Sequence, residues 1–358
     1  MTGRCLVPRA WCLVLSSWCL VLGASCLVLT GTGPTTAALT EAPRLAAVYD
    51  AILDARFEQA ETELKQACPP APEGACQALR VVSLSWQILI NPESRLLDQR
   101  FADLAATTIA ANLAWVQREP QRAEARFYLA GAYAPRAQWR VLRGERLGAA
   151  RDGKKIKDAL ERALQLDPAL NDAHFGVGLY HYYADVAPAA AKVLRWLLFL
   201  PGGDRVKGLQ EMLQARDRGE LLRGEADYQL HVLYLWYEQK TAEALDLLER
   251  LDVRYPNNPL FRERIAETRD VYLHDHAGSA AAWQALLARA LAGRVYAART
   301  TEVRARLGLA SELSEMNRTA EAIEQLKRVV DMQPVEPLGA RTRAEHELRA
   351  ALARTSRR

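Results

Sequence analysis

Histidine and acidic side chains are the residues of this sequence best suited to bind a metal ion, and their spacing indicates whether they can do so together. His346-Glu347 begins the pattern of a zinc protease, but position 350 is Ala, so the second histidine ligand is absent. His274 and His276 flank one aspartate and point to different sides of a helix, so joint ligation needs an irregular backbone.

A second histidine pair, His174 and His181, shares one helix face with Asp172 and Asp185 nearby in the sequence. Two helical turns separate the two imidazoles by about 10 Å, which is too far for direct chelation of one ion. The sequence also contains no nucleophile elbow, phosphate-binding loop or paired cysteine ligand set. We therefore expect no catalytic residue, no metal and no cofactor, and a protein that is not an enzyme.

Aromatic and arginine side chains on both sides of a central apolar stretch are better candidates for function. On a concave helical surface such side chains are common anchors for protein partners. The alternative is ordinary packing between helices. The candidate partner-binding residues are Trp139, Arg140, His174, Tyr180, Tyr182, Tyr183, Trp196, Asp204, Arg205, Tyr228, Trp236 and Tyr237.

The elements that position these residues are predicted to be helices. Half of the 358 residues are apolar and a quarter are charged, which is typical of a globular protein. Alanine and leucine dominate, and no segment alternates with the period of a strand, so an all-α fold is expected. The net charge is +4, without a basic stripe interleaved with aromatics, so we expect no nucleic-acid partner.

Residues 1–38 have the pattern of a secretory signal peptide. Arg4 and Arg9 precede an uncharged apolar run over residues 11–29, and small residues follow it. An uncleaved membrane anchor over residues 11–29 and a lipoprotein signal at Cys26 are the alternatives. Cys-Leu-Val recurs every seven residues from position 5, which also points to a misassigned start. The expected location is extracytoplasmic, either periplasmic or secreted, with membrane anchoring as the alternative.

Two cysteines lie beyond the leader, Cys68 and Cys76, on either side of a proline-rich loop. In an oxidising compartment this pair is expected to form a disulfide that joins two helix ends.

Three terminal prolines, Pro168, Pro256 and Pro334, set the frames of helix–turn–helix repeats of about 34 residues. Small and apolar residues recur at matching positions before each proline: Leu160, Ala163, Ala244, Leu248, Leu251, Ala322, Leu326 and Val329. Gly144 and Ala310 occupy the small position of a first helix. These repeats resemble the tetratricopeptide repeat (TPR) family, which implies a right-handed superhelical solenoid in which each repeat contacts only its neighbours.

Four regions follow from these frames. Residues 1–38 form the leader, 39–134 form N-terminal helical hairpins, and 135–258 form TPR-like repeats with an inserted helical hairpin at 184–224. Residues 259–358 form C-terminal TPR-like repeats and a capping helix. Within the last region a hairpin over 259–292 is expected to turn at Gly278-Ser279.

The insertion enlarges the central hairpin. An apolar helix over 187–200 precedes Pro201-Gly-Gly-Asp-Arg205 and Gly208-Leu209. This element resembles the centre of TPR proteins of the inclusion-body-clearance type and of bacterial secreted TPR proteins, and the resemblance implies an all-helical adaptor. The apolar helix is expected to be either core or an interaction surface. The sequence thus predicts a non-enzymatic exported scaffold for protein–protein interaction. The alternative is an accessory of a periplasmic transport system that holds a small ligand in its groove.

Overall fold

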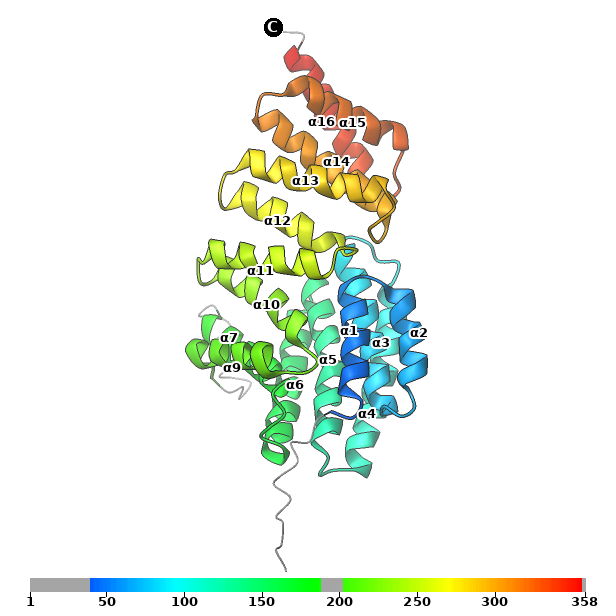
Figure 1. Ribbon diagram of the computed structural model, residues 1–358, viewed down its shortest axis with the longest axis vertical. Helices are drawn as coiled ribbons and strands as arrows, with labels where there is room; N and C mark the ends of the chain where they lie inside the picture. The colour runs from blue at the N-terminus through cyan, green and yellow to red at the C-terminus, as the bar shows by residue number, and fades with distance from the viewer. Residues whose placement is uncertain (1–38, 188–201, 356–358) are drawn as a thin grey trace, which may run out of the picture. The chain divides into compact units, whose positions relative to one another are not determined.

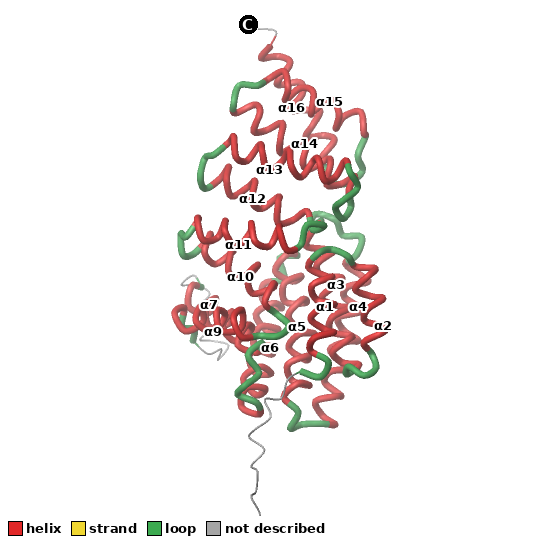
Figure 2. The backbone as a smooth tube through the Cα atoms, viewed as in Figure 1, coloured by secondary structure: helices red, strands yellow, loops and turns green. Residues whose placement is uncertain are grey.

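The computed structural model of the protein (Figure 1) describes residues 39–187 and 202–355, which belong to one unit, Thr36–Arg358. Every regular element of these residues is a helix (Figure 2), so the expected all-α class is confirmed. The helices are α1 Ala42–Leu53, α2 Phe57–Ala67, α3 Glu73–Ile90, α4 Asp98–Arg118, α5 Ala123–Leu142, α6 Arg146–Leu166, α7 Ala173–Val186, α9 Arg205–Arg218, α10 Arg223–Trp236, α11 Thr241–Arg254, α12 Pro259–Val271, α13 His276–Leu291, α14 Ala298–Glu315, α15 Thr319–Met332 and α16 Ala340–Thr355.

Successive helices pack as hairpins into a TPR-like helical solenoid, and pairs α10–α11, α12–α13 and α14–α15 follow one another in Figure 1. Short turns join antiparallel neighbours, and small residues let the helices approach. The positions counted back from the three prolines are buried as predicted: Leu160, Ala163, Ala244, Leu248, Leu251, Ala322, Leu326 and Val329. Each buried leucine contributes about 1.5–3 kcal/mol of hydrophobic stabilisation.

Contacts between repeats distant in sequence depart from the expected neighbour-only stacking. Arg254 Nη2 and Tyr255 Oη both reach the carboxylate of Asp50, at 3.0 and 2.6 Å. In the next turn, the backbone N–H of Asn257 donates to Asp54 Oδ1 at 2.9 Å. The C-terminal end of α1 therefore packs against the α11–α12 turn, about 200 residues away in the chain.

A buried carboxylate makes a second such connection. Glu225 in α10 accepts hydrogen bonds of 3.2 Å from the Tyr49 hydroxyl and the Trp86 indole. Burial raises the pKa of Glu225. The first hairpin is thus bonded to the middle of the solenoid.

The described part of the central insertion, α9, packs tightly on α7. Asp204 caps α9, because its carboxylate accepts a hydrogen bond from the Lys207 N–H at 2.9 Å. Gly178 and Gly208 face each other across the two helices, and a Cβ on either would lie 2.6 Å from the carbonyl oxygen of the other. In the Gly-Asp-Arg part of the motif, Asp204 therefore caps α9, and in the Gly-Leu part, Gly208 allows the backbones of α7 and α9 to touch. Residues 188–201 of the predicted apolar helix, with Trp196, lie outside the described residues.

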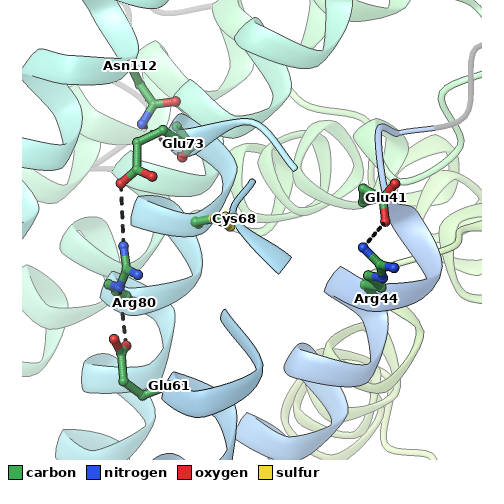
Figure 3. The surroundings of a disulfide bond; sticks show 9 residues. Glu41, Arg44, Glu61, Cys68, Glu73, Arg80 and Asn112 are labelled. Atoms are coloured by element: carbon green, nitrogen blue, oxygen red, sulfur yellow. Dashed lines mark hydrogen bonds and ion pairs between the residues drawn. A yellow bond between two sulfur atoms is a disulfide. The ribbon is translucent and has the colours of Figure 1, made fainter. Parts of the chain in front are cut away.

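Cys68 and Cys76 form the predicted disulfide, which joins the end of α2 to α3 (Figure 3). Arg80, one helical turn further along α3, bridges Glu61 of α2 and Glu73 of α3. The hairpin is therefore fixed by both a covalent bond and ion pairs.

Three expected boundaries are wrong. The boundary between residues 134 and 135 falls inside α5, which continues through buried Pro135, because a proline removes only one backbone hydrogen bond and flanking packing retains the helix. Gly144 lies in the α5–α6 turn at φ +82°, where a glycine is favoured, rather than inside a helix. Asp275 caps α13 through the Gly278 N–H, so Gly278-Ser279 opens that helix and the turn precedes it.

Within residues 39–187 and 202–355, no helix is both long and apolar enough to cross a bilayer. The predicted leader and the apolar run at 11–29 lie outside the described residues.

Candidate ligand-binding groove

A groove of about 500 Å³ lies along α12 and α14 and is also lined by residues from the segments 89–93 and 337–343. Five carboxylates and three guanidinium groups line it; we call it the acidic groove. Its charged residues are Glu93, Glu263, Arg264, Glu267, Asp270, Arg304, Glu312 and Arg343. The carboxylates exceed the guanidinium groups, so the groove favours a cationic ligand.

Helical periodicity places most of these groups. Glu263, Glu267 and Asp270 are spaced at i, i+4 and i+7 on α12, and Arg304 and Glu312 are two turns apart on α14. Each set therefore lies on one helix face, and the two faces meet at the groove.

Arg304 connects the groove to the distant end of α3. Its guanidinium donates to the Ile90 carbonyl and, at 2.8 Å, to the Asn91 side chain. It lies 3.4 Å from Glu93 and 3.6 Å from Glu263, so one cation is shared by two carboxylates. Asn91 also donates to Glu336 at 3.2 Å, which ties the loop before α16 to the same wall.

Glu263 is the most perturbed carboxyl group of the groove. It is 6% exposed, and its Oε1 has no hydrogen-bond partner within the described residues. Burial raises the pKa of Glu263 to about 7, although the charge of Arg304 opposes this shift. The group therefore titrates near neutral pH.

The apolar part of the groove is built around Trp283 of α13. A Cβ at Gly308 of α14 would lie 2.3 Å from the Trp283 ring, so glycine lets the indole pack directly on the α14 backbone. The wall of the groove thus contains a buried aromatic ring, only 9% exposed, beside its carboxylates.

His276 Nδ1 lies between two carboxylates that line the groove. It is 2.9 Å from Glu312 Oε2 and 3.3 Å from Asp270 Oδ1. The hydrogen bond to Glu312 raises the pKa of His276, while burial raises the pKa of Glu312. From the sequence, His276 is considered as a metal ligand only together with His274. The fold instead places His276 beside Asp270 of α12 and Glu312 of α14.

The predicted partner-binding residues divide into exposed and engaged groups. Tyr183, Trp236 and Tyr237 are exposed, and Trp236, at 63% exposed, lines a second pocket with Tyr272. Tyr183 and Tyr237 contact each other edge to face at 5.8 Å between ring centroids. These side chains remain available to a partner.

The Tyr182–Arg205 pair belongs to an internal network. The buried Tyr182 hydroxyl donates to Glu238 Oε1 at 2.5 Å, and Arg205 binds the same carboxylate through two nitrogens at 2.7 Å each. Asp204 caps α9 beside them. This network fastens the start of α9 to the α10–α11 turn.

The remaining candidates make intramolecular contacts. Tyr228 is buried against Trp86, and Trp139 donates to Asp98 at 3.1 Å. Arg140 binds the buried Asp152 at 2.6 Å, and Lys157 lies over the Tyr180 ring at 5.5 Å. His174 is partly buried, its Nδ1 has no hydrogen-bond partner among the residues that the structure describes, and burial lowers its pKa. Their role in partner binding stays a prediction.

Sequence reasoning did not select any residue of the acidic groove. The carboxylates at i, i+4 and i+7 on α12 were the available signal, but the same spacing is typical of a solvated helix face.

No family model matches this chain, and no curated protein matches it. Solved structures similar to it include the human IFIT1 dimer with PPP-AAAA, 14% identical over 84% of this chain and 69% of that one, with a TM-score of 0.44. A monomeric IFIT1 mutant with m7Gppp-AAAA is 12% identical over 83% and 67% of the two chains, with a TM-score of 0.43. A related mutant with Gppp-AAAA is 15% identical over 84% and 68%, with a TM-score of 0.41. These values are too low to support an inference about what this chain binds.

Proposed function

We propose that this protein is a non-enzymatic, extracytoplasmic scaffold that holds a basic segment of a partner protein in the acidic groove. The observation that carries the proposal is the excess of carboxylates along the α12 and α14 faces beside Trp283. Lysine or arginine side chains of a partner would pair with these carboxylates. A polyanion such as nucleic acid would be repelled by the same surface.

The lining also distinguishes the two roles considered from the sequence. A small-molecule carrier is expected to enclose an apolar pocket with few polar groups. The acidic groove instead has eight charged side chains. This composition favours a peptide over a small apolar ligand. The Cys68–Cys76 disulfide supports an oxidising compartment, because such bonds persist mainly outside the cytosol.

The test uses two fluorescein-labelled peptides of about twelve residues, one alternating lysine with alanine and one with every lysine replaced by glutamine. Binding is followed by fluorescence anisotropy in buffer containing a chelator, at low and high salt. We expect the lysine peptide to bind more tightly and its affinity to fall as salt increases, because the contacts are between partly exposed charges.

A double charge reversal, Glu93→Lys with Glu267→Lys, tests the location. Both side chains are exposed at the groove rim, so the fold should persist. The matched control is Glu58→Lys with Glu324→Lys, which makes the same change in net charge at exposed positions that do not line the groove. The groove variant should bind at least about tenfold more weakly, equivalent to about 1.4 kcal/mol. Equal weakening in the control, or no preference for the lysine peptide, would refute the proposal.

A further inference from the structure

Asp270, His276 and Glu312 come from three helices and converge with the spacing of metal ligands. They lie at the end of α12, the start of α13 and within α14. Their potential ligand atoms all lie within 4.8 Å of one another, and the two separations from His276 Nδ1 are 2.9 and 3.3 Å. Ligands about 2.1 Å from a tetrahedral zinc ion are separated by about 3.4 Å. A small outward movement of the ligands would therefore admit an ion.

Without an ion, the cluster also has fewer hydrogen-bond donors than acceptors. Imidazole Nδ1 carries at most one proton, so the two carboxylates that approach it must share that proton or leave one oxygen without a donor. Glu312 is buried, and burial of a carboxylate is unfavourable unless its charge is compensated. A divalent cation would be shared by all three ligand atoms and would compensate both charges.

A fourth polar group is independent of these three. Ser279 follows His276 by three residues in the first turn of α13, and it is fully buried. Its hydroxyl has no hydrogen-bond partner of ordinary geometry within the described residues. It nevertheless lies close enough to Glu312 to favour the charged form of that carboxylate. This buried hydroxyl beside the cluster is placed to hydrogen-bond a water on the ion or to orient Glu312.

We propose that Asp270, His276 and Glu312 bind one divalent transition-metal ion, with Ser279 in support. The set of one imidazole and two carboxylates suits Zn²⁺ better than Ca²⁺ or Mg²⁺, which prefer oxygen ligands alone. Three protein ligands leave a coordination position for water or for a group of a bound molecule. Asp270 and Glu312 also line the acidic groove, so the ion would sit at its edge and join α12, α13 and α14.

Isothermal titration calorimetry of the full chain with ZnCl₂ tests the site directly, without any peptide. The protein is first freed of metal with a chelator, and its free thiols are blocked with iodoacetamide so that leader cysteines do not bind zinc. We expect one zinc ion per chain, and His276→Gln should weaken binding at least about tenfold because a direct ligand is lost. Co²⁺ should give visible absorption bands that disappear in the same variant.

The control is His274→Gln, which removes an exposed histidine two residues away. It should leave zinc affinity unchanged, and circular dichroism should show native helicity in both variants. Absence of saturable zinc binding, or equal affinity in wild type and His276→Gln, would show that the cluster is only an ion-paired contact. Because no peptide is used, this result is separate from the outcome for the basic-segment proposal.

Discussion

The contact between α7 and α9 provides a sharp test of the packing that holds the central motif. Gly208→Ala places a Cβ on α9 at 2.6 Å from the Gly178 carbonyl oxygen and 2.7 Å from the Tyr182 nitrogen. Both obstacles are backbone atoms, so no side chain can rotate away. An ordinary contact would need about 3.4 Å, so α9 must retreat by roughly 0.8 Å.

The size of the effect follows from two opposing terms. Overpacking a close contact costs about 1–3 kcal/mol. Alanine gains up to about 1 kcal/mol over glycine inside a helix, which offsets part of this cost. We therefore expect Gly208→Ala to destabilise the α7–α9 pair by up to about 2 kcal/mol.

Hydrogen–deuterium exchange is the appropriate assay, because repeat proteins open locally and a single unfolding midpoint would average over the chain. Amides of α7 and α9 should exchange about tenfold faster in Gly208→Ala. The control is Gly153→Ala in α6, where the new Cβ has no atom within 4 Å and exchange should slow. If Gly208→Ala also slows exchange, the two helices are not in backbone contact and the reasoning is refuted.

Two further predictions concern the disulfide and the groove. Thiol titration of denatured, unreduced protein should find no reactive thiol beyond the four cysteines of residues 1–38, because Cys68 and Cys76 are blocked. Reduction should lower the free energy of unfolding by about 2–3 kcal/mol because a short loop is released, and two additional reactive thiols before reduction would contradict the disulfide. The pKa of Glu263 is raised from the ordinary value of 4.5 to about 7 in the folded state, because the side chain is buried. Its contribution to the free energy of unfolding is therefore fully present below pH 4.5 and is lost as the pH rises towards 7. Glu263→Gln should remove up to about 3 kcal/mol of this pH dependence, measured as the difference in urea stability between wild type and variant from pH 4.5 to 8; parallel profiles would exclude the raised pKa.

The aromatic candidates show how far side-chain type alone can indicate function. Tyr228 and Trp236 are both aromatic residues of α10, yet Tyr228 is buried and Trp236 is exposed. The difference depends on Trp86 of α3 and Phe261 of α12, whose rings pack against Tyr228. The identity of a covering helix is a long-range property, so local sequence could not separate a binding residue from a core residue.

By itself, the sequence determined the helices, the three proline-terminated repeats and the Cys68–Cys76 pair, because these depend on local periodicity, chain-stopping residues and short separations. Tertiary structure decided the acidic groove and the His276 cluster. Arg304 meets Asn91 across 213 residues, and His276 meets Glu312 from another helix. Periodicity shows which residues share a helix face, but it does not show which distant element that face will meet. The residues we expect to bind ligands are therefore fixed by contacts that only the folded chain makes.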